Sequence, residues 1–137
     1  MGVRFDETRW PVLVAVFEGD HDEETIEQFK STLDGYYARR TPFVTVYHIV
    51  DYKSSDARFV KPAAQWYASR REAVQGLEAG MALVIPSDTF RFILSSILVV
   101  ARLPKHYEVV TSVASGVDWA ERRMAEFARS AAKQATR

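Results

Sequence analysis

Histidine and acidic side chains are the first groups in this chain of 137 residues that could do chemistry. The three histidines, His21, His48 and His106, stand far apart in the sequence. They lack the short spacings that bring two imidazoles onto one metal ion. The acidic run from Asp20 to Glu24 could hold a cation, but the dipole of a helix favours carboxylates in its first turn without any ion. We therefore expect no metal site.

Nucleophilic chemistry has even less support. The chain contains no cysteine, which excludes a thiol nucleophile, a disulfide bond and a thiolate zinc site. Ser95 and Ser96 lie in an apolar stretch with no base nearby, and the Gly-x-Ser-x-Gly motif is absent. Glycine-rich phosphate loops are absent too. The sequence predicts no catalytic residue and no cofactor.

Arginine near aromatic residues is a better candidate for recognition. Arg58, Trp66 and Arg70 fall on one predicted helix at 58–78. A guanidinium stacks on aromatic rings and binds carboxylates through two hydrogen bonds, so these residues predict a surface for a protein partner or an anion. Arginines that extend over a solvated helix face are the simpler explanation of the same residues.

The residues from 90 to 103 form the most apolar stretch of the chain, and their length and periodicity predict a helix capped by Ser87 or Asp88. One broad arc of this helix is apolar and suits a sheet. A second apolar ridge, formed by Phe92, Val99 and Leu103, lies outside that arc. The ridge is either buried against a neighbouring helix or exposed at an interface. With their polar neighbours, the predicted interface residues are Phe92, Val99, Leu103, Arg91 and Arg102.

Charge and hydropathy narrow the class of partner. Lysine plus arginine equals aspartate plus glutamate, at 18 each, so the chain lacks the basic excess of nucleic-acid binders. The apolar stretch is too short to cross a bilayer, which needs about 20 residues, so no transmembrane segment is expected. Because the first residues also lack the apolar core of a signal peptide, we expect a cytoplasmic protein.

The alternation of strand and helix patterns predicts one α/β domain over 1–137, with a frayed tail at 133–137. We expect the order ββαβαβαβα, with a mainly parallel five-stranded sheet, one antiparallel edge strand and four helices. Gly80 is interpreted as the stop of the second helix, and Ser115 or Asp118 as the cap of the last. The expected strands are 3–7, 12–18, 43–50, 81–85 and 107–110, and the expected helices are 22–39, 58–78, 90–103 and a final helix that begins near 115.

The element order and the polar loop at 51–56 resemble the STAS domain, the fold of bacterial anti-sigma-factor antagonists. The likeness extends to a helix with Arg58 and Trp66, followed by the strand Gly-Met-Ala-Leu-Val at 80–84 and by residues 87–91. The resemblance implies a regulatory domain without catalytic activity that binds a protein or, in some relatives, a nucleotide or lipid. It also implies regulatory phosphorylation at Ser54 or Ser55, although helix capping is an alternative role for both serines.

Together these patterns predict a signalling domain that binds a protein partner and pairs as a homodimer through the helix at 90–103. The alternative is a carrier or sensor, in which the same apolar helix would line a pocket for a lipid or another hydrophobic small molecule.

Overall fold

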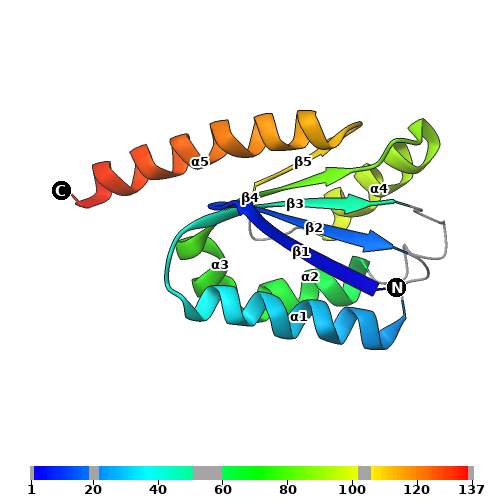
Figure 1. Cartoon of the computed structure of the whole chain (residues 1–137), viewed down its shortest axis with the longest axis horizontal. Helices are drawn as coiled ribbons and strands as arrows, with labels where there is room; N and C mark the ends of the chain where they lie inside the picture. The colour runs from blue at the N-terminus through cyan, green and yellow to red at the C-terminus, as the bar shows by residue number, and fades with distance from the viewer. Residues whose placement is uncertain (1, 19–21, 51–59, 102–105, 136–137) are drawn as a thin grey trace.

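Five strands and five helices make up the part of the chain that the computed structural model describes, which is residues 2–18, 22–50, 60–101 and 106–135. The strands form one sheet in the order β1-β2-β3-β4-β5 (Figure 1). They are β1 (Gly2–Arg9), β2 (Val12–Glu18), β3 (Phe43–Ile49), β4 (Glu78–Val84) and β5 (Tyr107–Val110). The helices are α1 (Glu23–Ala38), α2 (Val60–Ser69), α3 (Arg71–Leu77), α4 (Asp88–Ala101) and α5 (Val113–Ala135).

Strand directions confirm the predicted α/β class. β1 pairs antiparallel with β2, and every other neighbouring pair is parallel. The strands predicted at 12–18 and 107–110 have the observed bounds. The strand order follows the chain order, so each crossover moves one position in the same direction across the sheet. Right-handed crossovers of this kind place their helices on one face.

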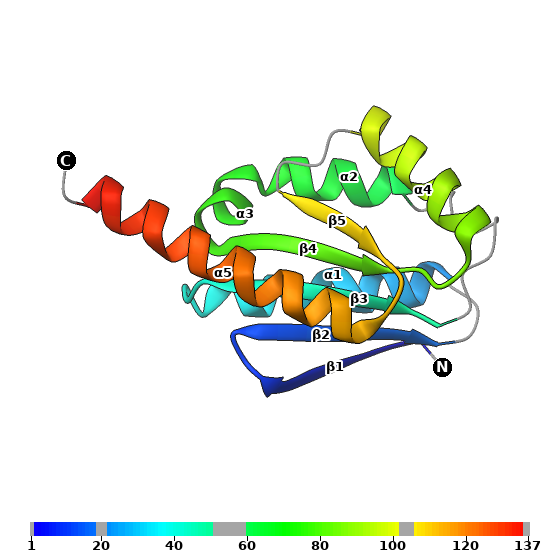
Figure 2. The same cartoon turned by 90° about the horizontal axis from the view of Figure 1, so that it is seen from above.

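The two faces of the sheet are therefore covered unequally. Helices α1, α2, α3 and α4 share one face, and α5 covers the other alone (Figures 1 and 2). The core under α1 and α2 is rich in aromatic side chains, including Phe29, Tyr37 and Phe43. The core under α5 consists of small side chains such as Val44, Val46 and Ala82.

The number of helices differs from the expected four because the segment predicted as one helix at 58–78 is two. α2 ends at Ser69, whose hydroxyl donates to the Trp66 carbonyl at 2.6 Å, a local bond that competes with the helical backbone. Arg70 then leaves the helical conformation, and α3 begins at Arg71. The observed order is therefore ββαβααβαβα.

The interpretation of Gly80 as a helix stop is wrong, because Gly80 lies inside β4. A Cβ atom there would stand 2.8 Å from Trp119 Cη2 and 3.1 Å from the His106 carbonyl oxygen. A side chain would collide with α5, so glycine is needed where this helix crosses the strand closely. β4 begins earlier than expected, at Glu78 rather than at Met81.

The start of α5 also differs from the expected caps at Ser115 or Asp118. α5 begins at Val113, and the hydroxyl of Ser112 accepts the Ser115 N–H at 3.1 Å. Ser112 thus caps the first turn.

Along α5, Val117 and Ala120 are buried, whereas Ala131 is exposed. The difference arises because the C-terminal part of α5 extends past the end of the sheet (Figure 2). α5 continues to Ala135, beyond the point where fraying was expected. Among the described residues, no helix combines the length and apolar character required to cross a bilayer.

Candidate functional site

Helix α4 carries the candidate interaction surface and lies beyond β5, at one edge of the molecule (Figure 2). It contacts α2 and β5. Leu94 and Leu98, one turn apart, are buried in the aromatic core and anchor the helix. The Ser87 hydroxyl is 3.5 Å from the Phe90 N–H, in the capping position that the sequence predicts.

The opposite side of α4 is an exposed ridge, defined here as Phe92, Ser96 and Val99. These residues stand at positions i, i+4 and i+7 and so share one helix face. The side chains of Phe92 and Val99 are 75% and 70% exposed. The Ser96 hydroxyl donates to the Phe92 carbonyl at 3.0 Å, so its polar hydrogen already has an acceptor within the helix. A partner could cover the ridge without leaving that hydroxyl unpaired.

The other three residues predicted for this interface, Arg91, Arg102 and Leu103, are not part of the exposed ridge that the structure describes. The Arg91 guanidinium donates to Asp88, and one of its nitrogens is 3.4 Å from the Pro86 carbonyl oxygen, so Arg91 folds back onto the start of α4. Leu103 and Arg102 lie outside the described residues.

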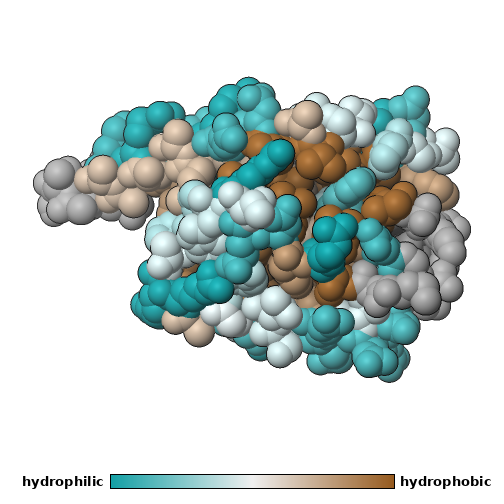
Figure 3. Space-filling view, viewed as in Figure 1, coloured by the Kyte–Doolittle hydropathy of each residue, from teal (hydrophilic) through white to brown (hydrophobic). Residues whose placement is uncertain are grey.

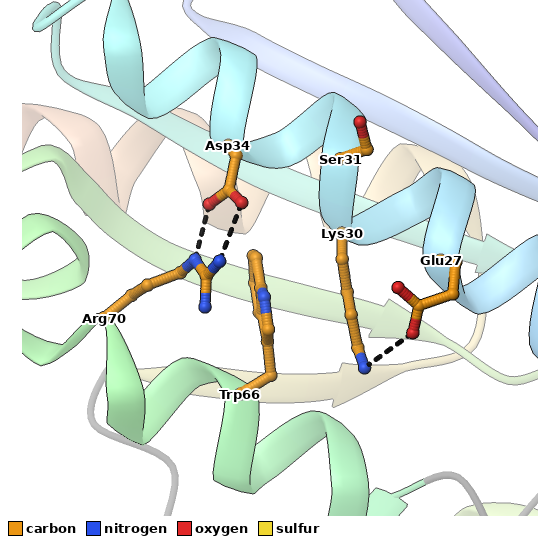
Figure 4. Close-up of a pocket in the computed structure, with 6 residues that line it drawn as sticks. All are labelled: Glu27, Lys30, Ser31, Asp34, Trp66 and Arg70. Carbon is orange, nitrogen blue, oxygen red and sulfur yellow. Dashed lines mark hydrogen bonds and ion pairs between the residues drawn. The ribbon is translucent and has the colours of Figure 1, made fainter.

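Of the residues predicted for a recognition surface at 58–78, the structure describes Trp66 in α2 and Arg70 between α2 and α3. Arg70 stacks on Trp66, with its guanidinium carbon 4.4 Å from the ring centroid. It also donates to both carboxylate oxygens of Asp34 in α1, at 2.5 Å and 2.8 Å (Figure 4). This hydrogen bonding to Asp34 raises the pKa of Arg70. Because its guanidinium already binds a carboxylate, Arg70 ties the junction of α2 and α3 to α1 instead of presenting a free anion site.

A shallow groove of about 340 Å³ follows this contact between α1 and α2. Its lining is mixed in charge, and Trp66 at its base is only 9% exposed. Figure 4 shows the Trp66 ring between the side chains of Arg70 and Lys30. The groove is lined by Glu27, Lys30, Ser31, Asp34, Trp66 and Arg70, so it does not involve α4. Five of these six side chains are polar or charged, so the groove suits a polar ligand better than an apolar one.

A buried polar cluster lies deeper in the same layer, and the sequence reading missed it. Glu78 is 2% exposed at the start of β4. Its carboxylate accepts the Tyr37 hydroxyl at 2.5 Å and the Thr45 hydroxyl at 2.8 Å. Nearby, the hydroxyls of Tyr47 and Tyr67 lie 2.6 Å apart.

The cluster changes the acidity of its tyrosines. Burial, and after it the charge of Glu78, raises the pKa of Tyr37 and of Tyr47 well above the ordinary value. Burial likewise raises the pKa of Tyr67. These groups stay protonated at neutral pH, so they serve as hydrogen-bonding core residues and not as bases.

The remaining residues with chemical potential do not converge. His48 is half-buried in β3 and His106 is exposed. Over the described ranges, no group of three histidine or acidic side chains could hold a metal ion. Asp22 caps α1 by accepting the Thr25 N–H at 2.8 Å, as its place in the acidic run suggested. The residues named for phosphorylation and for the arginine surface, Ser54, Ser55 and Arg58, lie outside the described residues, as does His21.

Comparison with protein-family models, with curated proteins and with solved structures finds no match to this chain. A proposal for the function of this chain therefore rests on its own structure.

Proposed function

We propose that this chain is a cytoplasmic regulatory domain of the STAS-like kind, without catalytic activity, that binds protein and pairs with a second copy through α4. The observation that carries the proposal is the exposed ridge, where a Phe and a Val project into solvent from a helix that the fold already anchors by its other side. Large apolar side chains grouped on one rigid face are typical of protein-interaction surfaces.

The position of α4 supports this role. The helix stands at the edge of its layer, so a partner can approach the ridge from the side of β5 (Figure 2). Two-fold pairing is the commonest arrangement for a patch of this kind. An antiparallel pair of α4 helices would set Phe92 of each copy beside Val99 of the other, because the two residues lie at equal distances from the midpoint between Ser95 and Ser96.

The energy of such a contact is modest. Burial of a large apolar side chain contributes about 1.5–3 kcal/mol, so the four side chains across a two-fold axis supply about 4–8 kcal/mol when their present partial burial is subtracted. Loss of free translation and rotation opposes this by an amount of similar size. We therefore expect a weak contact, populated at high micromolar concentration.

Sedimentation equilibrium of the wild type and of a variant with Phe92→Glu and Val99→Glu tests the proposal. We expect the average mass of the wild type to rise with concentration, and the variant to lose the share of association that α4 provides. Charged residues on the ridge prevent its burial, because a carboxylate cannot be desolvated there without a partner.

A matched control carries the same two added charges on α5, at Ala125→Glu and Ala128→Glu, where both alanines are exposed. This control should associate like the wild type. Equal association of the ridge variant and the α5 variant would rule out α4 as the contact surface.

A further inference from the structure

Strand β1 forms the opposite edge of the molecule from α4, and its outer side is open. In the described part of the chain, β1 pairs with β2 and with no other strand. No helix stands in front of it in Figure 1, and Figure 2 places it at the border of the sheet. From the same side, Figure 3 shows hydrophilic side chains scattered over hydrophobic surface between α5 and α1. An open edge of eight residues is a template for another strand.

The side chains of β1 alternate between the two faces of the sheet. Phe5 points to the α1 side, where its ring packs against Phe29 and Tyr36. Arg4 and Asp6 therefore point to the α5 side. They carry opposite charges on either side of Phe5 in the sequence.

We propose that a second copy of this chain adds its β1 antiparallel to this edge, in the register centred on Phe5. In that register Arg4 of each copy lies opposite Asp6 of the other, which forms two equivalent ion pairs, and the two Phe5 side chains are neighbours on the α1 side. The two sheets then join into one continuous sheet.

The charges select this register against its neighbours. If the pairing is centred on Arg4, two guanidinium groups face each other at the axis. If it is centred on Asp6, two carboxylates do. Like charges directly opposite each other destabilise a strand pair, and opposite charges stabilise it. The same side chains that discourage random edge pairing thus admit one arrangement with a two-fold axis.

Local contacts leave both charged groups available for this pairing. Asp6 uses its Oδ1 atom to accept the N–H and the hydroxyl of Thr8, at 2.8 Å and 2.7 Å. Within the described residues, both of these bonds go to Oδ1, so the second oxygen, Oδ2, can accept from an arginine. Arg4 meets Glu18 at 3.3 Å, and both side chains are more than half exposed, so solvent weakens this pair and it can rearrange.

Helix α1 has a flank that suits the same arrangement. At 100° per residue, Gln28, Thr32 and Gly35 share a flank with Arg39, which binds Glu7 of β1 at 2.6 Å. The flank of α1 on the β1 side therefore carries no charged residue among Gln28, Thr32 and Gly35. The other flank, toward α2, carries charges at Glu27, Lys30 and Asp34.

A two-fold axis perpendicular to the sheet would keep both α1 helices on one side and bring their uncharged flanks toward each other. A Cβ atom at Gly35 would meet nothing within 4 Å in a single copy. That open space is available to the neighbouring helix.

Charge exchange tests this contact in a background that carries Phe92→Glu and Val99→Glu, so that α4 does not contribute. We expect the background protein to dimerise in low salt, and Arg4→Asp to raise its dissociation constant at least tenfold. Arg4→Asp combined with Asp6→Arg should restore the dimer, because the pair is then present with reversed signs. A monomeric background protein, or failure of the exchanged pair to restore association in a folded variant, would overturn the proposal.

A second variant addresses the α1 flank without altering any charge of β1. Gly35→Arg fills space that is empty in one copy, so it should leave the fold intact and weaken the dimer at least fivefold. Hydrogen exchange gives a direct readout: the amides of Val3 and Phe5, which point to the open edge, should gain protection as protein concentration rises, and those of Tyr107 to Val110 in β5 should not. Protection that does not depend on concentration would argue against strand pairing.

Discussion

The two faces of the sheet are built on different physical plans. On the α1 side, aromatic rings fill the core, and hydroxyls and a carboxylate are buried among them. On the α5 side, valines and alanines form a thin core, and the single helix lies close to the strands. Neighbouring residues of β3 show the contrast, because Phe43 belongs to the first core and Val44 to the second, and both are fully buried.

The difference shows how the helices are held in one position on each face of the sheet. The aromatic face depends on hydrogen bonds with fixed partners, because a buried carboxylate without its donors is costly. The valine face depends on distance of approach, which glycines at Gly80 and Gly116 permit. The ridge on α4 and the flank of α1 beside the proposed β1 contact both belong to helices anchored on the aromatic face.

Alkaline pH should destabilise the protein through the buried tyrosines of the aromatic face, and this is the largest effect that we expect. The pKa values of Tyr37, Tyr47 and Tyr67 are raised in the folded state, so their contribution is complete below the unfolded value of about 10 and is lost as the pH rises above it. Each such tyrosine lowers the free energy of unfolding by about 1.4 kcal/mol per pH unit in that range. Circular dichroism between pH 9 and 12 should record cooperative unfolding.

Tyr37→Phe sharpens this measurement. The variant removes one titrating group, so the loss of stability above pH 10 should be shallower by about 1.4 kcal/mol per pH unit. At neutral pH it should be less stable by about 1–3 kcal/mol, because Glu78 loses a hydrogen-bond donor. The same steepness in both proteins would contradict the role assigned to Tyr37.

Truncation of the two adjacent residues in β3 compares the faces directly. Phe43→Ala should lower the free energy of unfolding by about 3–5 kcal/mol, since it removes a ring that packs against Trp10, Tyr36 and Tyr37. Val44→Ala removes two methyl groups from the thin core and should lower it by about 2 kcal/mol. Urea denaturation of both variants gives the comparison, and equal losses would show that the faces do not differ in packing.

Periodicity predicted most of the fold because each pattern is local. The strand at 12–18 reads as a continuous apolar run, and the helix at 22–39 carries its own acidic first turn. The break at Arg70 was not predicted this way, since the local bond of the Ser69 hydroxyl is accompanied there by a partner 36 residues earlier, Asp34. The position of Gly80 was misread for the same reason, because its small size matters only once Trp119 lies above it.

In the candidate site, too, the features set by local spacing were predictable and those set by the whole fold were not. The spacing of Phe92 and Val99 placed them on one helix face, and the sequence left open whether that face was buried. Exposure is a property of the whole fold, because it depends on what stands beside α4. Glu78 gave no signal, since an acidic residue near the end of a helix pattern is usually solvated.

Exchange of glycine for alanine at two positions tests the close approach on the α5 face, and the change at Gly35 gives the smallest of the expected effects. Gly80→Ala places a methyl group 2.8 Å from Trp119, so α5 must shift, and we expect a loss of about 1–3 kcal/mol. Gly35→Ala, in the middle of α1 where a Cβ meets nothing within 4 Å, should instead add about 0.5–1 kcal/mol by reducing the freedom of the unfolded chain. Thermal unfolding of the two variants should therefore move in opposite directions. If Gly80→Ala were neutral, α5 would adjust freely over β4, and the valine face would not owe its fit to close approach.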